Sequence, residues 1–157
     1  MQTVSARSAH LVDSIVAVAV PDDETRLRLQ LVAWLGPGWS YLEGTEAATA
    51  AEHNQWRWMD ERAELGLTTF EPVSVRMKVV MQSFGKPRNV RLSLAGSEIG
   101  VLTIAPGKSQ YDVPRFAINR GVNRVEFTAL DGAELPATGD PRRLSVALFY
   151  VEVSTDD

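Results

Sequence analysis

The stretch Ser74-Val-Arg-Met-Lys-Val-Val-Met81 decides the fold class, because its apolar residues recur at every second position. Val75, Met77, Val79 and Met81 alternate with residues that are mostly polar or charged. Successive side chains of a β-strand point to opposite faces. The period of two therefore predicts a strand with one face in a hydrophobic core and the other in water.

Similar patterns extend on both sides of this stretch. Alternation recurs at 27–33, 63–67 and 90–94, and less regular apolar runs cover 11–20, 99–104, 111–118, 122–130 and 144–153. Turn residues such as Gly85-Lys-Pro87 and Asp131-Gly132 separate the runs, and strand starts recur every ~8–15 residues beyond position 60. The run 144–153 is apolar on both faces, which predicts a central or covered strand. We predict an all-β fold, a two-sheet antiparallel sandwich that is jelly-roll-like with about nine strands.

The composition fits a single domain that spans residues 1–157. The hydrophobic and charged fractions, 45% and 23%, are typical of globular proteins. We expect residues 1–10 to be frayed and 36–55 to form a long aromatic and Ala-rich loop. The net charge of −4 and the dispersed basic residues argue against a nucleic-acid partner. The sequence has no cysteine for a disulfide or a thiol nucleophile, and no apolar run reaches the ~20 residues of a membrane span.

All four tryptophans fall between positions 34 and 58. Aromatic rings stack on the C–H faces of sugars, and polar side chains bind sugar hydroxyls. The candidate carbohydrate-binding residues are Trp39, Tyr41, Glu43, Trp56, Arg57 and Trp58, with Asn54, Gln55 and Asp60 as further polar groups. On a strand, Trp56 and Trp58 share one face and Arg57 takes the other. The alternative is structural: the Trp-Arg-Trp strand caps one end of the sandwich, and Trp34 lies in the core.

The order of motifs around these tryptophans resembles a known kind of domain. Leu35-Gly-Pro-Gly-Trp39, Glu43, Trp56-Arg-Trp-Met59 and Ala63-Glu-Leu65 resemble a β-sandwich domain appended to bacterial polytopic membrane glycosyltransferases and related envelope proteins. Asp140–Leu148 is similar to the last strand of such domains, and the resemblance covers residues 33–153. Ser40 and the inserted Ala-rich stretch depart from the pattern. The resemblance implies an extracytoplasmic accessory domain, periplasmic or at the cell surface, within a larger envelope protein associated with glycan chemistry.

The residue types that catalysis requires do not form a recognisable set. His10 and His53 stand apart, and no nucleophile elbow, phosphate loop or zinc-protease motif is present. The acidic residues near the tryptophans, Glu43, Glu46, Glu52, Asp60 and Glu61, have the pattern of solvated loop charges rather than a glycosidase pair. We expect no enzyme activity, no catalytic residue, no cofactor and no bound metal. Calcium stays open as an alternative at Asp22-Asp-Glu24 or at Asp131 and Asp140.

These observations favour a non-catalytic extracytoplasmic accessory module that binds a glycan or supports a membrane glycosyltransferase. The alternative is a structural or protein-interaction domain without a small ligand. Such a domain would dock on a membrane protein or self-associate through an apolar face of 144–153.

Overall fold

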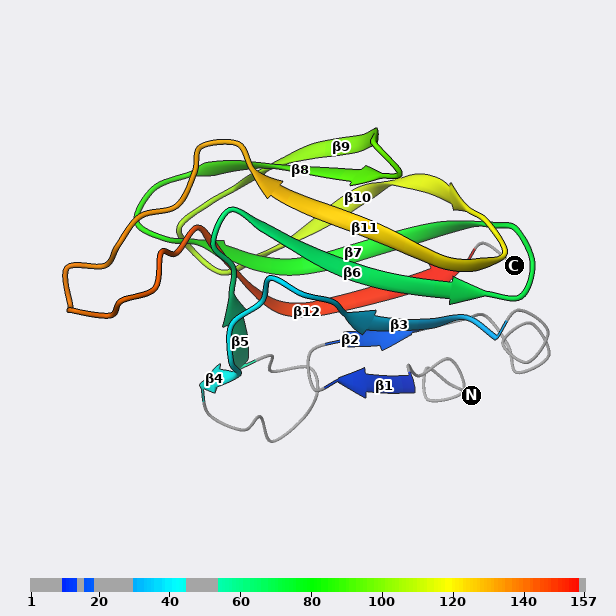
Figure 1. The fold of residues 1–157 in the computed structure, drawn as a ribbon, viewed down its shortest axis with the longest axis horizontal. Helices are drawn as coiled ribbons and strands as arrows, with labels where there is room; N and C mark the ends of the chain where they lie inside the picture. Colours follow the sequence, from blue (N-terminus) through cyan, green and yellow to red (C-terminus); the bar gives the residue numbers. More distant parts are fainter. Residues whose placement is uncertain (1–9, 14–15, 19–29, 45–53, 156–157) are drawn as a thin grey trace.

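The computed structural model describes residues 10–13, 16–18, 30–44 and 54–155. Within these residues the chain forms twelve β-strands and no helix (Figure 1). No helix of the described part is long and apolar enough to cross a membrane. The predicted all-β sandwich is confirmed, because the strands form two sheets that bury one core between them.

The two sheets have seven and five strands, here named sheet A and sheet B. Sheet A contains β1 (His10–Asp13), β2 (Val16–Val18), β4 (Glu43–Gly44), β5 (Gln55–Trp58), β7 (Val73–Ser83), β10 (Ser109–Ile118) and β12 (Val146–Thr155). Sheet B has the order β3 (Val32–Leu35), β6 (Arg62–Thr69), β11 (Gly121–Ala129), β8 (Arg88–Leu94) and β9 (Ser97–Ile104).

Strand β12 is the centre of sheet A, as its apolar run predicted. It pairs with β7 along one side. Along the other side it pairs with β5 at one end and with β2 further on (Figure 1). The pairing of β2 with β12 is the one parallel contact between the described strands, and all the others are antiparallel.

The core confirms the alternation that predicts the fold. Val75, Met77, Val79 and Met81 on β7 are at most 1% exposed. They belong to one cluster with the inward residues of sheet B, among them Leu65, Leu67, Val90, Leu92, Val125 and Phe127. Burying a large apolar side chain stabilises the fold by about 1.5–3 kcal/mol, so these two faces supply most of the driving force.

Some local expectations change. The run 11–20 forms two strands, β1 and β2, which pair antiparallel. Of the run 27–33 the structure describes only 30–33, and the strand begins at Val32. Of the expected loop 36–55, residues 45–53 lie outside the described residues, and the rest includes β4 and the first residue of β5.

The expectation that Trp34 is a core residue is wrong. Leu31 and Ala33 are buried in the core, so the alternation turns Trp34 to the outer face of sheet B. Its indole lies across Gly66, where a Cβ atom would come within 2.2 Å of Trp34 Cε2. Gly66 therefore provides the slot in which the half-buried ring lies.

A β-bulge in β12 changes which side chains reach the outer face of sheet A. Leu148 pairs with Met81 and Tyr150 with Val80, so Phe149 is an extra residue between two paired ones. As a result Phe149 and Tyr150 both pack with Val80 outside the main core. Bulges commonly re-aim side chains in this way.

The edge strand β10 is interrupted near its middle. Its pairing with β7 shifts between Val113 and Phe116, a segment that includes Pro114. Proline has no backbone N–H and is confined to edges and bulges of sheets. The Pro114 ring lies close to Gly100 of β9, where a Cβ atom would be 3.0 Å from Pro114 Cγ.

A buried arginine fastens the beginning of β8 to the loop after β11. Arg88 is 1% exposed. Its Nε donates to the carbonyl of Gly132 at 3.0 Å, and Nη1 donates to the carbonyl of Phe84. Nη2 forms an ion pair of 3.1 Å with Glu134, whose side chain is 49% exposed. The charge is thus compensated by carbonyl dipoles and one carboxylate, as a buried cation requires.

Candidate functional site

Two of the predicted residues, Trp56 and Trp58, gather at one edge of sheet A. They come from β5, which pairs with the central strand β12. Both rings lie on the outer face, packed against Ala147 and Phe149. The ring centroids of Trp56 and Phe149 are 5.5 Å apart. The same-face placement follows from their spacing of two on a strand.

The rings surround a hollow of about 380 Å³, here named the aromatic hollow. It is lined by Asn54, Trp56, Trp58, Gln82, Lys108 and Phe149. Three aromatic rings and two side-chain amides are a combination suited to a small ligand, since such sites are mainly apolar with a few polar groups. The bulge in β12 and the pairing of Gln82 with Ala147 bring these side chains together from β5, β7 and β12.

Arg57 points to the other side of β5. Its Nη1 donates to the carbonyl of Ser40 at 3.2 Å, and the Ser40 N–H donates to the carbonyl of Trp58 at 2.7 Å. Arg57 does not line the aromatic hollow. Its described contact holds the 36–42 segment against β5.

Trp39 lies at one end of the core. It is half-buried, and its indole N–H donates to the carbonyl of Glu64 at 2.9 Å. Its ring meets Phe127 edge to face, with centroids 5.5 Å apart. With its N–H and one ring edge engaged, Trp39 has less surface for a ligand than a freely exposed loop aromatic.

Tyr41 and Glu43 belong to a network centred on Arg142. The guanidinium carbon lies 4.5 Å from the centroid of the Tyr41 ring, which is 62% exposed. Arg142 also forms ion pairs of 2.9 Å with Glu43 and 2.7 Å with Asp140. The hydrogen bond from Arg142 lowers the pKa of Asp140, and the bonds to Asp140 and Glu43 raise the pKa of Arg142. Asp140 and Arg142 therefore both stay ionised at neutral pH.

A second hollow, of about 520 Å³, borders this network. It is lined by Gly38, Trp39, Ser40, Trp58, Met59, Asp60, Pro141, Arg142, Arg143 and Leu144. Trp58 lines both hollows. The charged groups here are already matched, because Arg143 pairs with Glu61 at 3.0 Å and with Asp60 at 3.8 Å. The predicted residues thus divide between two neighbouring hollows rather than forming one site.

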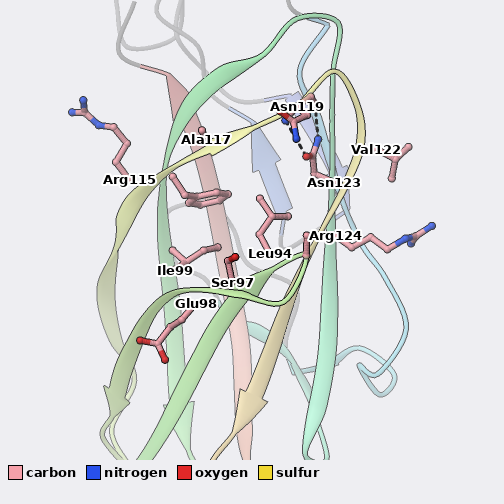
Figure 2. Close-up of a pocket in the computed structure, with 12 residues that line it drawn as sticks. Leu94, Ser97, Glu98, Ile99, Arg115, Ala117, Asn119, Val122, Asn123 and Arg124 are labelled. Carbon is pink, nitrogen blue, oxygen red and sulfur yellow. Dashed lines mark hydrogen bonds between the residues drawn. The ribbon is translucent and has the colours of Figure 1, made fainter.

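A third hollow, of about 710 Å³, lies between the β8–β9 turn and the β10–β11 turn (Figure 2). Arg115 and Arg124 are on its rim, and Figure 2 shows their side chains pointing away from it in opposite directions. Asn123 is committed to the turn, since it accepts from the N–H of Asn119 and donates to its carbonyl. This hollow has the larger volume, but its polar groups do not converge on a ligand.

The acidic residues considered for catalysis or calcium have partners of other kinds. Glu43, Asp60, Glu61 and Asp140 each pair with Arg142 or Arg143, and Asp131 accepts the N–H of Asn89 at 2.6 Å. Across the described residues, no three His, Cys, Asp or Glu side chains are grouped to hold a metal ion. Residues 22–24, Glu46, Glu52 and His53 lie outside the described residues.

Sequence reasoning missed Phe149, Gln82 and Lys108 as members of the aromatic hollow. Asn54 was anticipated as a polar group beside the tryptophans, and it does line this hollow. Phe149 lies on a strand whose apolar run signals only burial, and the bulge that turns it outward has no mark in the sequence. Gln82 and Lys108 come from strands and turns that are brought to β5 only by the sheet order.

Comparison with known proteins identifies the fold. The chain matches no protein-family model, and no curated protein sequence matches it. Among solved structures, a family 35 carbohydrate-binding module from an environmental isolate matches with a TM-score of 0.50 at 11% identity, over 78% of this chain and 93% of the module. The exo-β-1,3-galactanase of Phanerochaete chrysosporium gives a TM-score of 0.50 at 12% identity, over 78% of this chain and 29% of the enzyme.

The chain spans 19% of the length of a ruminal GH26 endo-β-1,4-mannanase and 27% of a Podospora anserina GH26-CBM35 mannanase. The former match has 16% identity, 74% coverage of this chain and a TM-score of 0.42. At 11–12% identity, the likeness to the two structures with a TM-score of 0.50 establishes a shared fold and nothing beyond it. The fold is the β-sandwich of carbohydrate-binding modules, in agreement with the predicted jelly-roll-like class.

Proposed function

We propose that this chain is a non-catalytic carbohydrate-binding module and that the aromatic hollow is its binding site. The observation that carries the proposal is the convergence of Trp56, Trp58 and Phe149 on one outer sheet face, with the amides of Asn54 and Gln82 in the same hollow. A pyranose ring can stack its C–H face on an aromatic ring, and its hydroxyls can form hydrogen bonds with side-chain amides. The shared fold of carbohydrate-binding modules supports this choice.

The proposal includes the setting of the module. The motifs between residues 33 and 153 resemble domains appended to membrane glycosyltransferases, so we place this module outside the cytoplasm, as part of a larger envelope protein. There it would hold or orient glycan near the enzyme to which it is attached. The arginine-paired state of Glu43, Asp60 and Glu61 favours binding over hydrolysis, because a glycosidase acid and base must be available to the substrate.

The structure removes the main argument for the alternative, a protein-interaction domain. It depended on an uncovered apolar face of β12. Ala147 and Phe149, the apolar residues on the outer face of this strand, are 1% and 7% exposed beneath Trp56, Trp58 and Tyr150. Strand β12 therefore presents no bare apolar surface among its described residues.

The test is calorimetric titration of the wild type and Trp56→Ala with a panel of neutral and acidic oligosaccharides. Trp34→Ala is the matched control, because Trp34 is also a half-buried tryptophan on an outer face but belongs to sheet B. We expect Trp56→Ala to weaken binding about fivefold or more, since loss of an aromatic stack amounts to about 1–3 kcal/mol. The control should bind like the wild type. Equal loss in both variants, or no binding by the wild type to any glycan, would overturn the proposal.

A further inference from the structure

The aromatic hollow and the second hollow adjoin at Trp58. This residue lines both the aromatic hollow, of about 380 Å³, and the second hollow, of about 520 Å³, beside the Arg142 network. Each volume lies within the range of about 300–1,000 Å³ that is usual for ligand pockets. A ligand that fills the aromatic hollow therefore reaches, at Trp58, the border of another hollow of ligand size.

Tyr41 lies beside Trp58 at this border. The N–H of Ser40 donates to the carbonyl of Trp58 at 2.7 Å. Two residues beyond Tyr41, Glu43 pairs with Trp56. The segment that carries Tyr41 therefore runs antiparallel along β5, next to the stretch of strand that carries both tryptophans of the aromatic hollow.

The ring of Tyr41 is exposed but held in place. It is 62% exposed, and the guanidinium of Arg142 lies over it, 4.5 Å from its centroid. Arg142 is itself fixed by ion pairs with Glu43 and Asp140. Arginine stacks on aromatic faces, so this arrangement orients the ring. A ring that is already oriented loses little conformational freedom when a ligand stacks on it, which favours binding.

The polar groups of the second hollow suit sugar hydroxyls. Asp60 and Arg143 both line it, and their charged atoms are 3.8 Å apart, beyond the usual hydrogen-bond distance. Their side chains are 53% and 47% exposed. A hydroxyl both donates and accepts, so a sugar in this hollow can donate to the carboxylate and accept from the guanidinium.

We propose that the ligand is a linear oligosaccharide bound along its chain, with one part in the aromatic hollow and the next part beyond Trp58, in the second hollow and against Tyr41. The inference rests on the proposed function and specifies its ligand as a stretch of chain rather than a single terminal sugar. Once one part is bound, binding of the next part is intramolecular, so affinity rises with chain length until both hollows are filled.

The experiment measures affinity against chain length by calorimetry. The probes are cello-, manno-, laminari- and galacturonate oligosaccharides, each from the monosaccharide to the hexasaccharide. The variants are Tyr41→Ala, Tyr41→Phe and Phe70→Ala. Phe70 is the matched control, because it is 51% exposed and has the guanidinium of Arg120 5.0 Å from its centroid, but lies in the β6–β7 turn and lines neither hollow.

We expect the affinity of the wild type for at least one series to rise about tenfold or more with length. Tyr41→Ala should reduce that gain about fivefold or more, the effect of losing one aromatic stack. Tyr41→Phe keeps the ring and should keep the gain, and Phe70→Ala should behave like the wild type.

Two outcomes would overturn this inference and leave the proposed function standing. One is an affinity of the wild type that does not change with length. The other is an equal loss for short and long oligosaccharides in Tyr41→Ala, because a tyrosine that only shields Arg142 would act through the fold and not through the length of the ligand. Absence of binding to every glycan would overturn both proposals.

Discussion

Replacing Arg88 with methionine should lower the free energy of unfolding by about 3–5 kcal/mol, because it leaves buried carbonyl groups without their hydrogen-bond donor. The guanidinium is 1% exposed and donates to the carbonyls of Gly132 and Phe84. Each hydrogen bond from a charged group contributes about 1.5–3 kcal/mol, and the two bonds to these carbonyls are lost together with a longer one, of 3.4 Å, to the hydroxyl of Ser83. Methionine fills the space of the aliphatic stem and removes the cost of burying a cation. The expected loss in the free energy of unfolding is therefore near the lower end of the summed hydrogen-bond energies.

The ion pair with Glu134 is the smaller part of this energy, because Glu134 is half exposed. Glu134→Gln should therefore cost about 1 kcal/mol or less. Urea denaturation of both variants, followed by circular dichroism, gives the two losses, provided that the m-value is unchanged. Similar losses in both variants, or a loss below about 1 kcal/mol for Arg88→Met, would refute the view that carbonyl bonds hold this arginine.

Two other features give sharp expectations. At Gly38, φ is +104° and a Cβ atom would lie 2.4 Å from the carbonyl oxygen of Arg62, whereas at Gly139, φ is +90° and no atom lies within 4 Å. Urea denaturation should show that Gly139→Ala lowers the free energy of unfolding by about 1–2 kcal/mol, from backbone strain alone. Gly38→Ala should lower it clearly more, because its Cβ atom also meets the backbone of Arg62. Equal losses in the two variants would contradict the crowding at Gly38. Burial, and then the charge of Glu152, raises the pKa of Tyr150 above its ordinary 10.0. In an alkaline absorbance titration, the phenol of Tyr150 should stay protonated after ordinary tyrosines have ionised. Because the folded state disfavours the ionised phenol, the free energy of unfolding should fall as pH rises above about 10, and it should fall less in Tyr150→Phe. A phenol that ionises at the ordinary value would contradict this expectation.

The layers of the fold could be predicted because burial imposes a period of two wherever one strand face is wet. Val75, Met77, Val79 and Met81 show that period and are buried as expected. The size of Trp34 suggested the core, whereas its position next to the buried Ala33 sets it on the outer face. Parity along a strand is thus a better guide to burial than the size of one side chain.

The candidate site was harder to predict, because it depends on contacts between distant strands. The sequence placed Trp56 and Trp58 on one face, and the structure agrees. The sequence did not reveal that Phe149 would join them. A bulge changes which residues of a strand point to which face, and the bulge in β12 has no signature in composition. Lys108 was missed for a similar reason. Its nearness to Phe149 follows from the pairing of β10 with β7 and of β7 with β12, which no local pattern encodes.

The interrupted strand β10 also bears on how such domains behave when many are crowded together. A free sheet edge invites a neighbouring molecule to add a strand, the first step towards fibres. A strand added along β10 would have no backbone N–H to bond at Pro114, and the register of β10 shifts between Val113 and Phe116. An uninterrupted ladder of backbone hydrogen bonds could therefore not form. The β10 edge is therefore a poor template for edge-to-edge pairing between two copies of the domain.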